Sequence, residues 1–449
     1  MTLLAFNWQA FGANLGQFIL SFSILIIIHE FGHFITAKWF GCRVEKFYLF
    51  FNPWFSLWKK KIGETEYGIG WLPLGGYVKI SGMIDESMDK EAMKQPPQPW
   101  EFRSKPAWQR LIIMLAGVIL NILLAFAIFA MMLFVWGEEK LPVQNAKYGF
   151  AFDSLSKTAG FQDGDMIKSV NGKDLRYVGD YTKAIFFNED KVVGIVRNGK
   201  DTSIKMPSGF LSKLTKSETK QLMAPRFPVV VSSDADVKYV SGKLQKGDTV
   251  VGVNQTFFKY FDEYIAAKKD LTNQEITLHV VRANGDSAAV KVKTDDRTAT
   301  KFVPIDPAEI LGIEKIEYGF FESIPAGVRF ANDKLTEYID GIKLLFTSKE
   351  HKVQDNLGSL ISIGKTFGGV WDWHRFWLMT GLFSVILAFM NVLPIPALDG
   401  GHALFTLIEM VTGRKPSDKF MEYAQMVGMV LLLGLMAYAL GLDIFRLFK

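Results

Sequence analysis

Four long apolar stretches constrain the fold of this chain more than any other feature. They run over residues 15–40, 108–136, 376–398 and about 423–440. A helix needs about 20 mostly apolar residues to cross a bilayer core of about 30 Å, and each stretch reaches or approaches that length. The sequence therefore predicts a multi-pass α-helical membrane protein with four spans.

The composition supports a chain that is part membrane protein and part soluble protein. Apolar residues make up 49% of the 449 positions, yet the central part reads as ordinary soluble sequence. The net charge is +5, and the basic residues gather beside the apolar stretches, as expected for contact with a lipid bilayer. We therefore expect no nucleic-acid partner.

The number of cysteines limits the kinds of metal site and cross-link, and the charge of the first residues bears on whether a signal peptide is present. Cys42 is the single cysteine, so neither an internal disulfide nor a cysteine-based zinc knuckle can form, and a metal site must use histidines and carboxylates. The first 37 residues contain no Lys or Arg, and a cleavable signal peptide needs a positively charged start. We expect the first apolar stretch to remain in the mature protein.

Flanking charges predict the orientation of the spans. Basic residues are concentrated in the loop at 41–107 and in the link at 403–422, namely Arg43, Lys46, Lys59, Lys60, Lys61, Lys79, Lys90, Lys94, Arg103, Lys105, Arg414, Lys415 and Lys419. By the positive-inside rule both segments lie in the cytoplasm. Both termini and residues 137–374 then lie on the other side.

The cytoplasmic loop has a glycine-rich centre. Residues 66–80 read EYGIGWLPLGGYVKI, in which apolar and aromatic residues alternate around glycines and a proline. This pattern predicts a cytoplasmic β-hairpin at about 62–82. A plain structural turn is the alternative reading.

The extracytoplasmic part contains an internal repeat. Residues 161–173 read FQDGDMIKSVNGK and residues 244–256 read LQKGDTVVGVNQT, 83 positions later. Each copy predicts a Gly-Asp turn, a short strand and an Asn turn. We expect two extracytoplasmic β-rich domains, at 137–220 and 221–300.

A connector at 301–375 links these domains to the third span. Apolar and charged residues alternate at helical spacing over 322–346, which predicts an amphipathic helix. It can lie on the membrane surface or pack against a β-rich domain. The remaining segments are 1–40 for the first span, 376–402 for the third and 423–449 for the fourth with the C-terminus.

The first span carries an H-E-x-x-H sequence, His29-Glu30-Phe31-Gly32-His33. Residues four apart share one face of a helix, so both imidazoles can bind one Zn²⁺ while Glu30 serves as general base. Such a motif also arises by chance at solvated helix ends. Here it follows six residues without a charge inside a membrane span, where ionisable residues are costly and usually functional.

Asp399 is the candidate for the third metal ligand. Catalytic zinc usually takes three protein ligands, and Asp399 ends the third span on the cytoplasmic side, as the two histidines do in the first span. Pro394 and Pro396 break the helix just before it, and irregular backbone at that depth is tolerated where it lines a cavity. An interfacial carboxylate that caps a turn is the alternative for Asp399. Asn391 can bind substrate backbone or an oxyanion, or bond between helices.

These motifs resemble those of the site-2 proteases. The resemblance rests on H-E-F-G-H in the first span, A-G-V-I-L-N at 116–121 in the second and N-V-L-P-I-P-A-L-D-G-G-H at 391–402 in the third. Four spans with two PDZ-like domains between the second and third are similar to the bacterial RseP-type regulators. The resemblance covers nearly the whole chain.

The resemblance implies an intramembrane zinc metalloprotease of the bacterial inner membrane, active in regulated intramembrane proteolysis. It implies that His29, His33 and Asp399 bind zinc, that Glu30 is the base and that Asn391 and Pro394 handle substrate. The glycine-rich segment with Gly75 and Gly76, over about 69–78, would present a strand edge to the substrate. Implied substrates are single-span membrane proteins such as anti-sigma factors already trimmed by a site-1-type protease, and remnant signal peptides. The PDZ-like pair, on the periplasmic side, would act as a size filter, and the active site would face the cytoplasm.

Three other classes of protein remain as alternatives. A membrane-anchored scaffold with a vestigial metal site would not need the full set of His29, Glu30, His33 and Asp399. An ion or metal transporter usually shows repeated halves among its spans, and no such repeat is evident. A soluble zinc protease would not carry four apolar spans.

Overall fold

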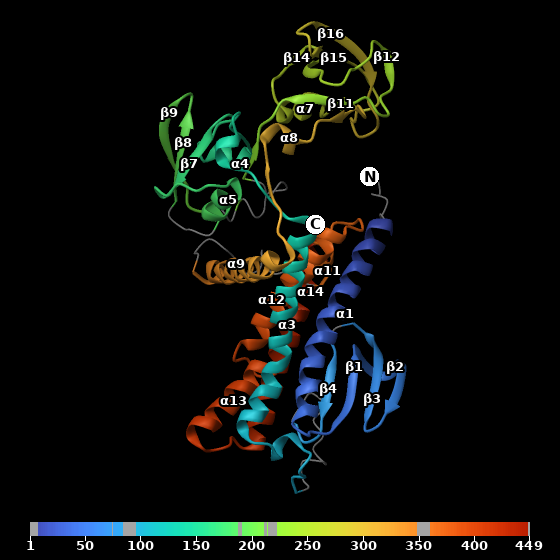
Figure 1. The fold of residues 1–449 in the computed structure, drawn as a ribbon, viewed down its shortest axis with the longest axis vertical. Coiled ribbons are helices and arrows are strands. Elements are labelled where there is room, and N and C mark those ends of the chain that lie inside the picture. The colour runs from blue at the N-terminus through green and yellow to red at the C-terminus, as the bar shows by residue number, and fades with distance from the viewer. Residues whose placement is uncertain are drawn as a thin grey trace. The chain divides into compact units, whose positions relative to one another are not determined.

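The computed structural model describes residues 8–73, 75–83, 96–186, 191–210, 213, 222–347 and 360–447 of the 449-residue chain. These residues form two compact units, one built mainly from long helices and one from sheets with short helices (Figure 1). The helical unit includes the chain up to Gly137, Glu317–Lys343 and the chain from residue 353, and the sheet-rich unit includes Glu138–Ile316 and residues 344–352.

Four helices of the described chain are long and apolar enough to cross a membrane, as the apolar stretches predicted. They are α1 (Trp8–Trp39), α3 (Ala107–Trp136), α12 (Trp373–Val392) and α14 (Asp418–Leu447). The α3 helix packs against both α1 and α12, so it is the central element of the helical unit.

The third predicted span ends earlier than expected. The α12 helix stops at Val392 instead of continuing toward 398–402, because Pro394 and Pro396 cannot extend the hydrogen-bond ladder. A separate helix, α13 (Asp399–Thr412), then begins at the aspartate itself. Much of the segment predicted as a cytoplasmic link at 403–422 is therefore helical.

The glycine-rich loop forms a four-stranded sheet. Its strands are β1 (Val44–Leu49), β2 (Phe51–Ile62), β3 (Thr65–Leu72) and β4 (Tyr77–Ile80), in the order β2-β3-β1-β4. The prediction of a hairpin at about 62–82 is wrong in its pairing: β1 lies between β3 and β4, parallel to β3 and antiparallel to β4. The hairpin is instead β2–β3, closed by a turn at Gly63. The β4 strand lies at one edge of the sheet.

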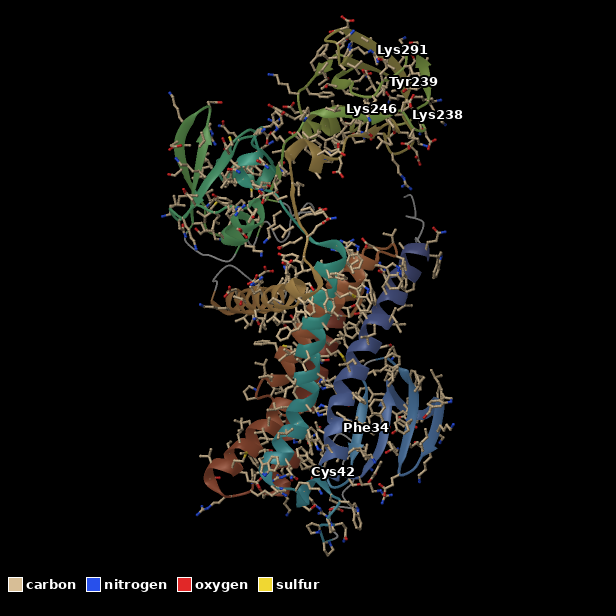
Figure 2. The ribbon with its side chains drawn as sticks, in the orientation of Figure 1. Phe34, Cys42, Lys238, Tyr239, Lys246 and Lys291 are labelled. Carbon is tan, nitrogen blue, oxygen red and sulfur yellow. The ribbon has the colours of Figure 1, made fainter. Side chains whose placement is uncertain are left out.

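The sheet is held against α1 by aromatic and small apolar side chains. The Phe34 ring of α1 meets the rings of Phe47 and Tyr67 edge-on, with centroids 5.5 and 6.0 Å away. Cys42 is buried close by in a cluster that includes Val44 and Ile80, and both Phe34 and Cys42 are labelled in Figure 2. These contacts fix the position of the sheet relative to the H-E-x-x-H helix.

The predicted amphipathic helix is α9 (Phe320–Thr347). Its Gly327 approaches the backbone of Ala130 on α3, and its Phe330 ring contacts Phe129 of the same helix. Tyr338 contacts Phe389 of α12. The helix therefore packs on two of the long apolar helices. Two shorter helical elements complete this unit, η1 (Phe102–Ser104) and α11 (Leu360–Lys365).

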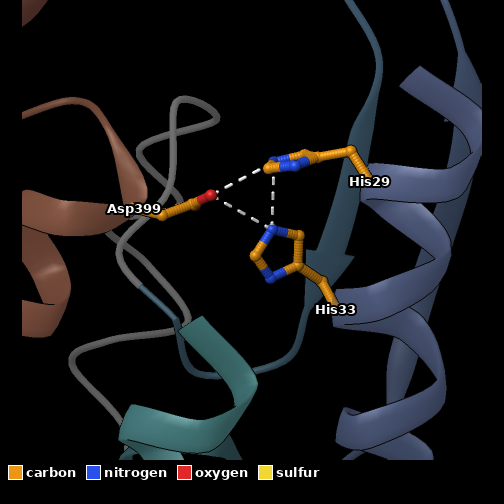
Figure 3. A group of neighbouring side chains, drawn as sticks. All are labelled: His29, His33 and Asp399. Atoms are coloured by element: carbon orange, nitrogen blue, oxygen red, sulfur yellow. Dashed lines mark hydrogen bonds and ion pairs between the residues drawn. The ribbon is translucent and has the colours of Figure 1, made fainter. Parts of the chain in front are cut away.

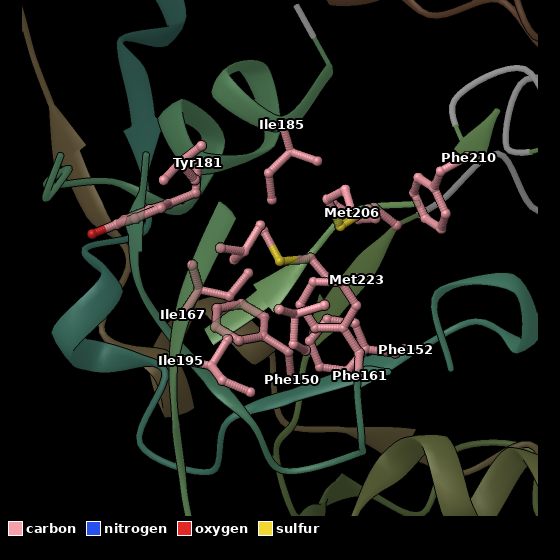
Figure 4. Close-up of a cluster of buried hydrophobic side chains, with 14 of the residues drawn as sticks. Phe150, Phe152, Phe161, Ile167, Tyr181, Ile185, Ile195, Met206, Phe210 and Met223 are labelled. Atoms are coloured by element: carbon pink, nitrogen blue, oxygen red, sulfur yellow. The ribbon is translucent and has the colours of Figure 1, made fainter. Parts of the chain in front are cut away.

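The first β-rich domain is built around an aromatic and aliphatic core. Figure 4 shows Phe150, Phe152, Phe161, Ile167 and Ile195 gathered in it. The core also takes in Leu222 and Met223, so the domain continues past the boundary predicted at 220/221, which lies outside the described residues. Its elements are η2 (Val143–Asn145), β6 (Phe150–Phe152), α4 (Ser154–Thr158), β7 (Met166–Val170), α5 (Val178–Phe186), β8 (Val192–Arg197), β9 (Lys200–Lys205) and β10 (Met223–Pro225).

The second β-rich domain is a twisted antiparallel sheet over one helix, and Tyr239 and Lys291 on its neighbouring strands β12 and β16 are labelled in Figure 2. Its last strand, β17, lies slightly beyond the predicted limit at 300. Its elements are β11 (Val229–Ser233), β12 (Tyr239–Ser241), β13 (Thr249–Val253), β14 (Thr256–Phe257), α7 (Phe261–Lys268), β15 (Glu275–Val281), β16 (Ser287–Lys293), β17 (Val303–Pro304) and α8 (Pro307–Leu311). β5 (Glu138–Lys140) and β18 (Glu314–Ile316) pair at the two ends of the sheet-rich unit.

The sequence repeat is also a structural repeat. Asp165 and Asp248 are both buried, and each accepts a hydrogen bond from a backbone N–H three residues earlier. Each also pairs with an arginine further along the chain, Arg197 at the end of β8 at 2.7 Å and Arg282 directly after β15 at 2.6 Å. The predicted Gly-Asp turns thus have the same role in both domains, since each buried carboxylate is neutralised within its own domain.

Candidate active site

The site is built first on α1. His29 and His33 lie one turn apart on this helix and both are buried (Figure 3). Because residues four apart share one helix face, their imidazoles converge, and the two Nε2 atoms are 3.3 Å apart.

Asp399 reaches the same point from the loop after α12. Its Oδ2 atom lies 3.1 Å from Nε2 of His29 and 3.3 Å from Nε2 of His33 (Figure 3). Ala397, two residues earlier, has φ 77°, a left-handed conformation that is unfavourable for a residue with a Cβ. The break caused by the two prolines thus turns the chain so that the aspartate faces the histidines.

The three atoms are spaced as ligands of one tetrahedral metal ion. Zinc bonds of about 2.0–2.1 Å to nitrogen or oxygen place the ligand atoms of a tetrahedron about 3.3 Å apart, close to the three distances in this site. Asp399 Oδ2 is buried and, apart from the two imidazole nitrogens, has no polar partner among the described residues, which would be costly for a carboxylate without a cation. The donor set therefore fits zinc.

Groups of the α3 helix contact the Nδ1 atoms of both histidines, on the side of each ring away from Asp399. Nδ1 of His33 lies 2.8 Å from the carbonyl oxygen of Ile113, and Nδ1 of His29 lies 3.2 Å from the side-chain amide of Asn121. An Nδ1–H that donates to a carbonyl leaves Nε2 as the metal-binding nitrogen. Gly117 lies between these two contacts, and a Cβ there would come within 2.4 Å of Nε2 of His33. Only glycine leaves room for the imidazoles.

Glu30 lines the pocket that contains these three ligand groups. It is adjacent to His29 on α1, and the backbone N–H of Val78 in β4 donates to its carboxylate. Gly76 lies on its other side, where a Cβ would be 3.3 Å from Cγ of Glu30. The edge strand β4 therefore positions the carboxylate beside the ligand cluster.

The pocket is walled by elements that are distant in the sequence. The described residues that line it are His29, Glu30, His33, Lys46, Phe51, Gly76, Tyr77, Val78, Lys79, Ile80, Met83, Met114, Ala397, Leu398, Asp399, His402 and Gln425. They come from α1, the β-sheet, α3, the loop before α13, α13 itself and α14. The length of β4 forms one side of it.

The structure brings most of the candidate residues together. His29, Glu30, His33, Asp399 and Gly76 share one pocket. Three other candidates lie outside the lining. Nδ2 of Asn391 is 3.4 Å from Nε2 of His29, Gly75 packs against the ring of Phe51, and Pro394 is exposed.

Other residues at the site were missed by sequence reasoning. Gln425 of α14 lines the pocket, Asn121 contacts His29, and Gly117 admits both imidazoles. Gln425 and Asn121 did carry a signal, because a polar side chain in an apolar span is usually functional or bonded to another helix. The hydrophobic periodicity of the sequence does not distinguish a functional polar residue from one that bonds to another helix.

Two histidines and a carboxylate at metal-ligand spacing, beside a glutamate and among helices of membrane-spanning length, define a membrane-embedded metalloprotease. Comparison with known proteins supports the same class of protein. The chain belongs to peptidase family M50, whose family model matches residues 17–435.

Several curated relatives match over nearly their whole length. The chain is 30% identical to a putative zinc metalloprotease of Vibrio cholerae, covering 97% of this chain and 99% of the relative. It is 28% identical to the regulator of sigma-E protease RseP of Escherichia coli, covering 99% and 100%. It is also 28% identical to protease RseP of Yersinia pestis, covering 97% and 99%. The chain is a zinc metalloprotease of the site-2 type.

Proposed function

We propose that this intramembrane protease cleaves the transmembrane segments of single-span membrane proteins, with His29, His33 and Asp399 as zinc ligands and Glu30 as general base. The observation that carries the proposal is the near-equilateral spacing of the three ligand atoms at 3.1, 3.3 and 3.3 Å. The buried Oδ2 atom of Asp399 supports it, because within the described residues this oxygen faces only the two imidazoles, and a cation would compensate its charge.

The residues around the proposed ligands have different roles in hydrolysis. Zinc, when bound, supplies Lewis acidity that polarises a scissile carbonyl and acidifies water. Glu30 accepts the proton of the attacking water and passes it to the nitrogen of the departing amine. The Val78 N–H keeps the Glu30 carboxylate aimed into the pocket during both transfers.

Asn391 is assigned a substrate-binding role in this proposal. Its amide lies beside His29 at the end of α12, 3.4 Å from the Nε2 atom. A donor at that position can stabilise negative charge on the oxygen of the carbonyl under attack. Pro394 then acts indirectly, by ending α12 so that Asn391 and Asp399 reach the same site.

The substrate must lose helical structure before cleavage, because the carbonyls of a helix are engaged in its own hydrogen bonds. We propose that the unwound segment adds to the free edge of β4, which replaces the lost backbone bonds. The edge offered is Tyr77–Ile80, since β3 is covered on both sides by β2 and β1. Gly76 brings the start of this edge close to α1, where a Cβ would meet Ile26, and Gly75 packs against the ring of Phe51 just before it.

The sidedness and the substrates complete the proposal. From the basic residues in the loops, we propose that the active site faces the cytoplasm of a bacterial inner membrane and that the two β-rich domains are PDZ-like and lie in the periplasm. There the pair would exclude substrates with bulky outer domains. The relative named regulator of sigma-E protease supports a role in the control of a sigma factor, and we propose anti-sigma-factor-like substrates that a site-1-type protease has trimmed first. Remnant signal peptides, which lack an outer domain, would pass the same filter.

The decisive experiment is cleavage of a tagged single-span reporter by the purified protein in detergent. We expect Glu30→Gln to lower the rate by at least about 100-fold with zinc content unchanged, and a chelator to abolish cleavage. The matched control is Glu64→Gln, which makes the same substitution at an exposed turn between β2 and β3. Cleavage by Glu30→Gln at the wild-type rate would reject Glu30 as the base. A zinc-loaded wild type that cuts no reporter would favour the scaffold alternative.

A further inference from the structure

One polar side chain of the pocket has no part in the chemistry described above. Gln425 lies on α14, within the apolar window of the fourth span, and is only 6% exposed. It lines the pocket together with His29, His33 and Asp399. Its Oε1 atom is buried and accepts no hydrogen bond from any group that the structure describes.

The position of Gln425 follows from a close helix contact one turn further on. Gly428 packs on the loop before Asp399 so tightly that a Cβ there would lie 1.9 Å from the carbonyl oxygen of Pro396. Residues three apart lie on the same side of a helix, so this contact turns Gln425 toward the loop and the pocket. The close approach holds α14 against the Asp399 loop.

A structural role in joining helices does not explain the side chain. Glutamine in a membrane helix commonly bonds to a neighbouring helix, but then its oxygen would have a donor. An unpaired buried acceptor is costly, and a ligand that supplies the missing donor would remove this cost. The partner must donate a hydrogen bond and must enter the active-site pocket.

An extended peptide meets both conditions. A strand added to the edge of β4 makes backbone hydrogen bonds on one side only, and its alternate N–H and C=O groups point to the other side. Those outward groups are left unpaired in a pocket lined by membrane helices, where water is scarce. Gln425, which comes from a different element than β4, can satisfy one of them.

We infer that Gln425 is a positioning residue that accepts a hydrogen bond from one backbone N–H of the substrate, on the edge not paired with β4. This inference rests on the proposed strand addition. It adds a specificity rule: the substrate residue opposite Gln425 cannot be proline, because proline has no backbone N–H. The recognition is otherwise independent of the substrate side chains.

The test removes each partner of the bond in turn. Synthetic single-span substrates carry an ester in place of one backbone amide, position by position across the cleavage region. The zinc-loaded full-length protein is compared with Gln425→Met, which keeps the length of the side chain without the amide. Val427→Ala, on an exposed face of the same helix, is the control variant.

We expect Gln425→Met to lower kcat/KM by about 3- to 10-fold, the loss of one net hydrogen bond, mainly through KM and with zinc content unchanged. One ester position should weaken cleavage by the wild type to the same degree and have no further effect on Gln425→Met. If Gln425→Met is recovered without zinc, Gln425→Asn, which withdraws the amide by one methylene, replaces it in the same scan.

Two results would overturn the inference alone. They are an unchanged kcat/KM in Gln425→Met, and ester effects that are equal in the two proteins at every position. Failure of the proposed function has a different signature, since the wild type would then fail to cut the all-amide substrate. In that case the inference falls with it.

Discussion

The Asn121 side chain of α3 lies directly against His29 of α1, with its Nδ2 atom 3.2 Å from Nδ1 of the histidine. The Oδ1 atom of the same amide is buried and has no hydrogen-bond partner among the residues that the structure describes. If Nε2 of His29 binds zinc, Nδ1 carries the proton, and the amide must present its oxygen. Exchange of the two amide atoms, which differ little in shape, satisfies both groups.

Asn121→Leu should therefore weaken zinc binding by about 10- to 100-fold, because His29 loses the acceptor that fixes its tautomer. Zinc retention against a chelating dye measures this without any need for substrate. Asn121→Asp, which keeps an oxygen at the site, should bind zinc more tightly than Asn121→Leu. Ile119→Ala, at an exposed position of the same helix, is the control. Equal retention by Asn121→Leu and wild type would refute the assignment.

Gly117 gives a second, steric prediction. A methyl group at this position would lie 2.4 Å from Nε2 of His33 and 2.7 Å from Cε1 of His29, and both imidazoles are also held by contacts to α3. Gly117→Ala should displace the rings and remove bound zinc, while the protein still inserts into membranes at the wild-type level. The zinc content of the purified variant, measured by metal analysis, tests this prediction.

Gly434→Ala is the matched control for this change, because a Cβ at that helical position meets no atom within 4 Å. It should retain zinc and activity. If Gly117→Ala also retained full zinc, the close approach between α3 and the histidines would not be required for the site.

The second β-rich domain offers a prediction about pH. Burial raises the pKa of Tyr264 to about 12, about two units above the usual value for tyrosine. The unfolded chain then loses the phenolic proton before the folded chain does, so the folded state binds more protons. The stability from this group is complete below about pH 10 and falls as pH rises toward 12, by about 2–3 kcal/mol in all.

The measurement is the Tm of the sheet-rich unit in the full-length protein, followed by circular dichroism between pH 9 and 11. Tyr264→Phe should reduce the loss of Tm over this interval, although its Tm at pH 9 falls because the hydrogen bond to Thr300 is gone. Tyr148→Phe, which changes an exposed tyrosine of the other β-rich domain, should leave the pH dependence unaltered. The same alkaline loss in Tyr264→Phe as in wild type would exclude this residue as its source.

Features that depend on local pattern were predictable from the sequence. The four long helices follow from uninterrupted apolar windows, and the convergence of His29 and His33 follows from the four-residue helical period. Asp399 could be placed near them because both segments were predicted to reach the same side of the membrane. The two prolines correctly indicated that the helix ends before the aspartate.

Features that depend on long-range pairing were not predictable. Residues 66–80 alternate like a hairpin, but their two strands pair with β1, which comes earlier in the chain. Nothing in the local pattern distinguishes these partners. Gln425 and Asn121 were not singled out from the sequence, because they lie far from His29 along the chain and nothing in the local pattern indicates that they are close to it in space.

The last prediction concerns the ion pair that connects α13 to α3. Nη2 of Arg110 lies 2.5 Å from Oε1 of Glu409, and Nε of the same arginine donates to the carbonyl oxygen of Lys105. Arg110 is buried. Asp399 begins α13 and Glu409 lies near its end, so this pair holds the helix that carries the third candidate ligand.

Glu409→Ala would leave the Arg110 cation buried without its partner, a change that costs about 3–5 kcal/mol at buried sites. We expect a lower Tm and weaker zinc retention, because α13 is no longer held in position. The exchange Arg110→Glu with Glu409→Arg should recover part of both, since it restores opposite charges. Glu139→Ala, at an exposed site, is the control. A lower Tm with normal zinc retention would mean that the pair stabilises the fold but that the Asp399 loop is positioned by other contacts, such as that between Gly428 and Pro396.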